Sequence, residues 1–190
     1  MMTYRPFTDR KTGLHPYSSV QINLPSILAD QIVRWGDETI KDSDIYSPPN
    51  DLIHGREDES HITLLYGIHS QSPEQVQAIL AREQPFEVRL GQISIFTTND
   101  EFDVVKIETS SPSLFYFNHL LKNNLQNTSS FDTYRPHVTI AYIKKNLYSN
   151  LIGNSNFKDW RWTANSVVFS SANGEKTPIR LNTLRPVCCS

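Results

Sequence analysis

Two short apolar segments of this sequence, 60–66 and 136–142, carry the same arrangement of chemically useful side chains. Each contains a histidine followed two positions later by a threonine: His61 and Thr63 in the first, His137 and Thr139 in the second. Both segments are rich in aliphatic residues and read as β-strands, in which side chains two positions apart leave from the same face. Each strand should therefore present an imidazole and a hydroxyl together. The other residues, up to and including Tyr66 and Tyr142, should point to the opposite face and into the core.

A pair of imidazoles can divide the work of proton transfer at neutral pH, because the free-solution pKa of histidine is about 6.5. One ring accepts a proton and the other donates one, which suits in-line displacement at phosphorus. The two threonine hydroxyls can donate hydrogen bonds to the non-bridging phosphate oxygens. The pattern does not decide which histidine is acid and which is base. A purely structural protein with buried, hydrogen-bonded histidines is the alternative to this chemistry.

The two segments resemble the paired H-x-T-x signature of the 2H phosphoesterase superfamily. Its members include 2′-5′ RNA ligase-like proteins, cyclic phosphodiesterases, enzymes that degrade 2′,5′-oligoadenylates, an RNA 3′-end-processing exonuclease and phage nucleases that cut cyclic oligonucleotide signals. The resemblance implies an enzyme without cofactor or metal that cleaves a cyclic phosphate, a 2′-5′ linkage, or a short or cyclic oligonucleotide. It does not choose among these substrates. A non-catalytic RNA- or nucleotide-binding module is the alternative of a different class.

The rest of the chain alternates between strand and helix patterns. Period-two alternation predicts strands over 17–24, 86–96, 102–109, 160–170 and 177–184. Helical spacing predicts a helix from Ser26 to a stop at Gly36, one after the capping box at 72–75, and one from Pro112. Long polar connections, 37–60 and 127–136, lead into the two His-x-Thr strands. The first is placed to cover a site.

The order strand, helix, polar connection, His-x-Thr strand occurs twice, over residues 18–68 and 102–143. Such a repeat predicts an α+β fold of two pseudo-symmetric lobes, each an antiparallel sheet with outer helices, around a central cleft. The 2H family is built in this way. We expect residues 1–190 to form one bilobal domain, with residues 1–16 as an irregular arm.

Four further residues are candidates for substrate binding. Tyr134 and Arg135 stand just before the second motif, Tyr17 could stack on a base, and Arg56 could reach a phosphate. Tyr46 and Phe131 are additional stacking candidates. For Arg56, an exposed ion pair with neighbouring acidic residues is the competing interpretation.

The composition limits the choice of partner. The formal net charge of −2 over 190 residues argues against a protein that coats long nucleic acid, and favours a small nucleotide or short oligonucleotide. No apolar stretch is long enough to span a bilayer, so we expect a cytoplasmic protein without membrane contact. No metal-ligand spacing is present, and the adjacent Cys188 and Cys189 read as free thiols at the tail.

Overall fold

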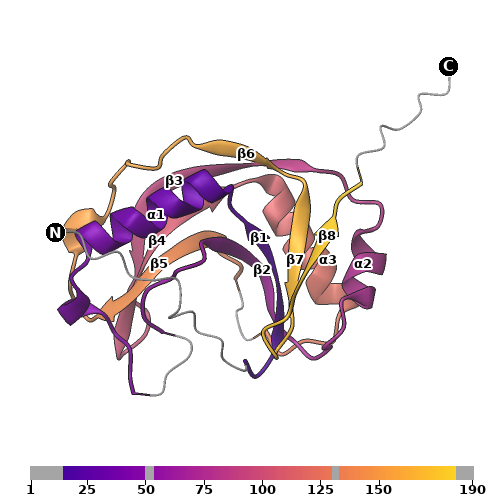
Figure 1. The fold of residues 1–190 in the computed structure, drawn as a ribbon, viewed down its shortest axis with the longest axis horizontal. Coiled ribbons are helices and arrows are strands. Elements are labelled where there is room, and N and C mark those ends of the chain that lie inside the picture. The colour runs from indigo at the N-terminus through magenta and orange to yellow at the C-terminus, as the bar shows by residue number, and fades with distance from the viewer. Residues whose placement is uncertain (1–14, 50–53, 130–132, 183–190) are drawn as a thin grey trace.

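The computed structural model describes residues 15–49, 54–129 and 133–182. Its strands form one eight-stranded antiparallel sheet in the order β6-β3-β4-β5-β2-β1-β7-β8. Figure 1 shows this sheet as an arch with β5 and β2 side by side at its middle. The α+β fold of two sheet halves with helices confirms the predicted class. The elements in chain order are β1 (Ser18–Asn23), α1 (Ser26–Thr39), η1 (Asp42–Asp44), β2 (His61–Ile68), α2 (Glu74–Leu80), β3 (Phe86–Phe96), β4 (Phe102–Ser110), α3 (Pro112–Asn124), β5 (His137–Lys144), η2 (Ser149–Leu151), β6 (Arg161–Ala164), β7 (Ser166–Ser170) and β8 (Lys176–Arg180).

The two halves of the sheet correspond position by position around the contact between β2 and β5. That contact is narrow, because the ladder between these strands consists of Ile62 opposite Val138. On either side of it, four pairs of directly opposite residues mark the correspondence: Asn23 with His61 and Gln21 with Thr63 in β1 and β2, and Glu108 with His137 and Lys106 with Thr139 in β4 and β5. The pseudo-two-fold axis therefore passes between the two motif strands.

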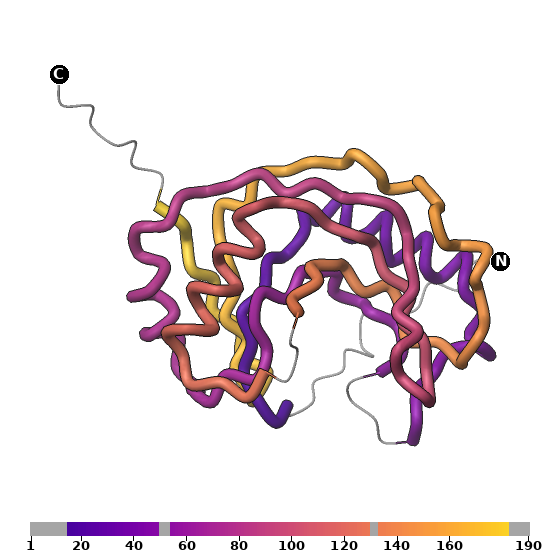
Figure 2. The backbone as a smooth tube through the Cα atoms, turned by 180° about the vertical axis from the view of Figure 1, so that it is seen from behind, coloured from indigo at the N-terminus to yellow at the C-terminus, as the bar shows by residue number. Residues whose placement is uncertain are grey.

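Each long helix ties one half of the sheet to the other. Helix α1 follows β1 but packs on β5, and α3 follows β4 but packs on β2. Gly36 of α1 lies so close to β5 that a Cβ there would come within 2.9 Å of Ile140 Cγ2. In the other half, Asn118 of α3 donates a hydrogen bond from Nδ2 to the carbonyl oxygen of Leu64 at 2.6 Å. The tube in Figure 2 shows both helices with the arch seen from behind.

A β-bulge at the same place in both halves changes which side chains face the site. Register shifts occur between Val20 and Gln21 opposite β2, and between Val105 and Lys106 opposite β5. One extra residue on each motif strand leaves two consecutive residues buried, and the burial pattern is iBiBBi in both strands. The tyrosines that follow, Tyr66 and Tyr142, are half-exposed on the face of the histidines. The prediction that they point into the core is therefore wrong.

The polar connections complete the hydrogen bonding of the motif strands where these diverge. Beyond Val138, β5 bonds to the first connection: Tyr142 donates its N–H to the Gly55 oxygen, and Ile140 accepts from Glu57. In β2, the oxygen of Gly67 accepts from the N–H of Thr128 in the second connection. An unpaired strand edge beside the site would be costly, and these segments cover the facing edges of β2 and β5 where the two strands diverge.

Several predicted boundaries need correction. Helix α1 continues through Gly36 to Thr39, because this glycine provides close packing and is not a stop. The predicted strand 160–170 is two strands: β6 pairs with β3, and β7 pairs with β1 and β8, on opposite sides of the sheet. In the predicted capping box the Ser72 hydroxyl accepts from Glu74 N–H at 3.4 Å, and Pro73 occupies the cap position. The cysteines, Phe131 and residues 1–14 of the predicted arm lie outside the described residues.

One core runs through both halves of the sheet. The aliphatic residues at the centre of the inner strands are fully buried: Val20, Ile62, Val105, Ile107 and Val138. They lie on the face of the sheet opposite the motif histidines and are covered by the helices. Among the described residues, no helix is long and apolar enough to span a membrane.

Candidate active site

The four motif residues form a square at the centre of the sheet. Because β2 and β5 are antiparallel, the pairing of Ile62 with Val138 places His61 opposite Thr139 and Thr63 opposite His137. The two histidines thus occupy one diagonal and the two threonines the other. Ordinary sheet geometry puts diagonal neighbours about 7–8 Å apart. All four side chains are partly exposed, whereas the residues between them are buried.

Both imidazoles are held by the same backbone contact. His61 Nδ1 lies 2.7 Å from the carbonyl oxygen of Glu59, and His137 Nδ1 lies 2.7 Å from that of Arg135. A carbonyl oxygen only accepts hydrogen bonds, so Nδ1 carries the proton in each ring. The Nε2 atoms are then the ones that can gain or lose a proton at a substrate.

The two halves of the site differ in charge. Beside the first motif, Gln21 Nε2 donates to Asn23 Oδ1 at 2.9 Å. The corresponding pair beside the second motif is ionic: Lys106 Nζ donates to Glu108 Oε1. A symmetrical backbone therefore carries a neutral pair next to His61 and a charged pair next to His137.

Lys106 is almost completely buried, with 2% of its surface exposed. Its Nζ also donates to Ser94 Oγ at 2.7 Å and lies 4.1 Å from the centre of the Phe96 ring. The buried ammonium is thus compensated by a carboxylate, a hydroxyl and an aromatic face. For Glu108, burial alone would raise the pKa of the carboxyl. The hydrogen bonds from Lys106 and Ser94 outweigh burial and lower that pKa.

Burial lowers the pKa of His137 below the ordinary value for histidine. The hydrogen bond to Arg135 and the charge of Glu108 act in the opposite direction, while the charge of Lys106 adds to the lowering. Phe96 packs edge-on against the ring, with 5.0 Å between centroids. These surroundings favour the neutral form of His137. On the other side, Glu57 Oε1 lies 3.9 Å from His61 Nδ1.

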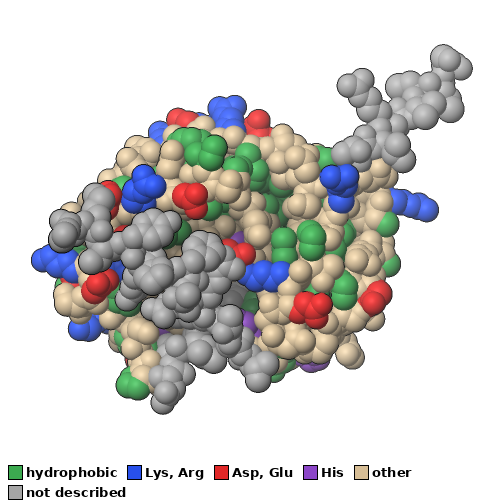
Figure 3. All heavy atoms as spheres, in the orientation of Figure 1, with side chains coloured by type: hydrophobic (Ala, Val, Ile, Leu, Met, Phe, Trp, Pro, Cys, Tyr) green, Lys and Arg blue, Asp and Glu red, His purple; other side chains and the backbone are tan. Residues whose placement is uncertain are grey.

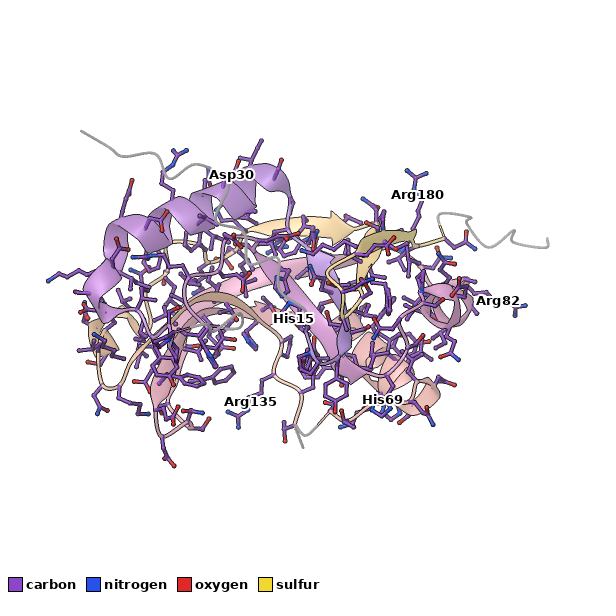
Figure 4. The ribbon with its side chains drawn as sticks, turned by 60° about the horizontal axis from the view of Figure 1, so that its bottom comes forward. His15, Asp30, His69, Arg82, Arg135 and Arg180 are labelled. Atoms are coloured by element: carbon purple, nitrogen blue, oxygen red, sulfur yellow. The ribbon has the colours of Figure 1, made fainter. Side chains whose placement is uncertain are left out.

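Of the other predicted site residues, Tyr134 and Arg135 lie beside the square. The Tyr134 hydroxyl donates to the carbonyl oxygen of Thr63 at 2.9 Å and so links the two motifs. Burial raises the pKa of this phenol. The Arg135 side chain is exposed, and Figure 4 shows it projecting away from the ribbon.

Arg56, which the sequence suggested as a phosphate ligand, lies at the end of α1. Its guanidinium donates to the carbonyl oxygens of Gly36 and Ile40 at the end of α1, and pairs with Asp42. Only 13% of the side chain is exposed. Arg56 therefore holds the end of α1 and the following turn, and these contacts occupy its guanidinium.

Aromatic clusters occupy the far end of each half of the site. Tyr17 packs edge-on against Tyr66 at 6.2 Å and stacks on His69 at 5.5 Å. At the equivalent position of the other half, Phe102 packs against Tyr142 at 5.5 Å, with Tyr46 at 5.0 Å from Phe102. Tyr17 thus lies at the far end of the β1–β2 half, against Tyr66 and His69.

The alternation of strand 17–24 predicted Gln21 and Asn23 on a polar face that could line a cleft, but sequence reasoning missed the Lys106–Glu108 pair. Its signal was available only as polar residues on alternate positions of strand 102–109. Strand pairing was needed to place both pairs next to the histidines. Among the described residues, no three His, Cys, Asp or Glu side chains are grouped as a metal-ligand set.

Comparison with known families decides the affiliation of this fold and site. The family model of the 2′-5′ RNA ligase superfamily matches residues 47–176, a span that contains both His-x-Thr motifs and most of the chain. The chain belongs to the 2′-5′ RNA ligase superfamily. This confirms the 2H phosphoesterase affiliation that the paired motifs predicted. No curated protein sequence matches the chain.

Solved structures of similar fold include TT0787 and E. coli LigT. TT0787 of Thermus thermophilus aligns with a TM-score of 0.58 and 16% identity, over 87% of this chain and 95% of that one. The apo form of E. coli LigT aligns with a TM-score of 0.58 and 18% identity, over 87% and 94% of the two chains. LigT in complex with 3′-AMP aligns with a TM-score of 0.55, 19% identity and the same coverage. At these identities the likeness establishes the common fold.

Proposed function

We propose that this member of the 2′-5′ RNA ligase superfamily is a metal-independent phosphodiesterase acting on a small nucleotide or short oligonucleotide. The observation that carries the proposal is the square of two histidines on one diagonal and two threonines on the other. In-line displacement needs a base on one side of the phosphorus and an acid on the other. A phosphate centred on the square has one imidazole on each side.

The proposed reaction uses these positions. For a 2′,3′-cyclic phosphate, a neutral imidazole takes the proton of the attacking water through Nε2, and the opposite imidazolium gives its Nε2 proton to the leaving ribose oxygen. Thr63 and Thr139 donate hydrogen bonds to the two non-bridging oxygens, whose negative charge grows in the transition state. The carbonyl contacts at Nδ1 keep both rings in orientation. The same arrangement serves a 2′-5′ linkage, with a ribose hydroxyl or water as nucleophile.

We assign His137 as the base in the hydrolytic direction. Its lowered pKa keeps the ring neutral near pH 7, which is the form that accepts a proton. His61, with the Glu57 carboxylate 3.9 Å from Nδ1, is then the acid. The roles exchange in the reverse reaction.

The ligand class is supported by charge and by the neighbouring structures. The chain has 18 basic and 20 acidic residues, and over the described part of the face shown in Figure 3 the two kinds are interspersed. E. coli LigT has been solved with 3′-AMP and with ATP, both of which are small nucleotides. A cyclic oligonucleotide signal and an RNA 3′ end are further substrates within the same reaction class.

The deciding experiment is incubation of the protein with a substrate panel in EDTA, with products resolved by chromatography. The panel contains 2′,3′-cyclic mononucleotides, 2′-5′- and 3′-5′-linked diadenylates, a cyclic dinucleotide and a short oligoadenylate. We expect cleavage of at least one of these by the wild-type protein and none by the His61→Ala/His137→Ala double variant. Binding without cleavage would support the non-catalytic alternative. Cleavage only after addition of Mg²⁺ or Mn²⁺ would contradict the metal-independent mechanism.

A further inference from the structure

A hollow of about 320 Å³ lies on the β3–β4 side of the square. Its position follows from the register. Lys106 is opposite Thr139 in β5 and opposite Ser94 in β3, so these three side chains form one row across the face that carries the histidines. Phe96, two positions after Ser94 and on the same face, both lines the hollow and touches His137. The hollow is therefore adjacent to the place where the phosphate would sit.

Three aromatic side chains line this hollow: Phe96, Phe115 and Tyr134. They come from three separate elements, the end of β3, the start of α3 and the segment before β5. Phe115 and Tyr134 pack edge-on at 5.7 Å. Phe115 is nevertheless 52% exposed, and an exposed phenylalanine at the mouth of an aromatic hollow has apolar surface available for a planar ligand. Aromatic faces of this kind stack on nucleobases.

The polar lining of the hollow offers a hydrogen-bond acceptor that no described residue uses. The Lys106 ammonium is occupied by Ser94, Glu108 and the face of Phe96. Glu108 uses Oε1 for both Lys106 and Ser94, and no hydrogen bond to a described residue occupies its Oε2. An ionised carboxylate can only accept, so Glu108 Oε2 favours a ligand that offers a hydrogen-bond donor, which on a nucleobase is an N–H group.

We propose that this hollow is the nucleobase subsite on the His137 side of the active site, and that Glu108 Oε2 accepts a hydrogen bond from an exocyclic amino group of the base. The inference rests on the proposed function, since it assumes that the ligand is a nucleotide. The preferred substrates are those with adenine, cytosine or guanine on this side of the phosphate, because these bases carry an exocyclic amino group. Phe115 and Phe96 stack on the base, and Glu108 reads its edge.

Phe115 and its neighbour Tyr116 provide a matched pair of variants. Both are about half exposed on α3, but Tyr116 packs against Phe117 and hydrogen bonds to Glu83, and is not part of the lining. We expect Phe115→Ala to weaken the binding of 3′-AMP about tenfold, the value of one stacked base, and Tyr116→Ala to leave it unchanged. Calorimetric titration with 3′-AMP measures this without turnover. Ribose 3-phosphate, which has no base, should bind equally to all three proteins.

The edge contact is tested by removing the amino group from the ligand. The 3′-monophosphate of purine riboside differs from 3′-AMP by this group alone, and wild-type protein should bind it about tenfold more weakly. In Glu108→Gln the difference should fall, because a neutral amide oxygen is a weaker acceptor. Equal effects of Phe115→Ala and Tyr116→Ala, equal affinity for the two ligands, or no binding of 3′-AMP by the wild type would overturn the subsite. If 3′-AMP binds as expected while no substrate of the panel is cleaved, the proposed activity fails and the subsite stands.

Discussion

At the scale of single residues, the proposed mechanism gives the two motif histidines different roles, although the backbone holds both in the same way. We predict that His61→Ala and His137→Ala each lower kcat by about 10²–10⁴-fold, the usual contribution of a positioned acid or base. The melting temperature should change little, because both side chains lie on the open face of the sheet. Initial rates on the best substrate of the panel, with thermal denaturation of the same samples, check both statements.

Thr63→Val and Thr139→Val are the matched controls for this prediction. They should reduce the rate without moving the limbs of the pH profile, since in the proposed mechanism the hydroxyls hold the phosphate and transfer no proton. A histidine variant with near-wild-type turnover would exclude the two-histidine mechanism. A large fall in melting temperature would indicate the structural role instead.

The charged pair beside His137 makes the pH profile a specific test of the base. The acidic limb of kcat/KM should report the pKa of His137, since the base must be neutral in the free enzyme. Glu108→Gln removes a charge that favours the imidazolium, so this limb should move to lower pH. Lys106→Met removes a charge that disfavours it, so the limb should move to higher pH. Each shift should be about 0.5–1 pH unit.

The neutral pair in the other half supplies the control for that assignment. Asn23→Asp places a carboxylate beside His61, which should raise the pKa of that imidazole and move the alkaline limb to higher pH. If Glu108→Gln moves the alkaline limb instead of the acidic one, the roles of the two histidines are the reverse of those we assign.

At the scale of elements, the crossed helices hold the two halves in register, and at Gly36 the backbone of α1 lies directly against β5. We predict that Gly36→Ala lowers the free energy of unfolding by about 1–3 kcal/mol. An alanine gains about 1 kcal/mol of helix propensity over glycine, but its methyl group would meet Ile140 Cγ2 at 2.9 Å, inside van der Waals contact. Denaturant titration measures the change. Arg34→Ala, at an exposed position of the same helix, should be nearly neutral, and a neutral or stabilising Gly36→Ala would show that α1 does not pack this tightly.

At the scale of the whole molecule, charge and shape favour a ligand with few phosphates. We predict that log Kd for the preferred nucleotide varies with log salt concentration with a slope of magnitude no greater than about 2, the value for one or two neutralised phosphates. Affinity for single-stranded RNA should not rise steadily with length. Titrations between about 50 and 200 mM salt measure both quantities. A steep collapse over that range, with tighter binding of longer RNA, would replace the small-ligand assignment with an RNA-processing role.

Local sequence patterns were sufficient to predict several strands and helices of this protein and its four motif residues. The β3 prediction of 86–96 has the observed bounds, and β4 and α3 differ from their predictions by a residue or so, since turn residues and proline mark their ends. The four motif residues were identified because a period-two strand pattern places His and Thr on one face, whatever the strand pairs with. Family affiliation followed from the same residues.

Register, bulges and the path of the chain across the sheet were decided by the tertiary structure. Tyr66 and Tyr142 face the site because each motif strand has one residue more than its partner, and a bulge depends on both strands. The chain divides at Asn165: β6 before it pairs with β3, and β7 after it pairs with β1 on the other side of the arch. The hydrophobic periodicity of the segment could not indicate this division. The charged and neutral pairs became neighbours of the histidines only through the pairing of β4 with β5 and β1 with β2. The sequence by itself determined which groups could do the chemistry, because side-chain type and strand period are local; their partners and unequal surroundings depend on contacts between residues far apart in the chain.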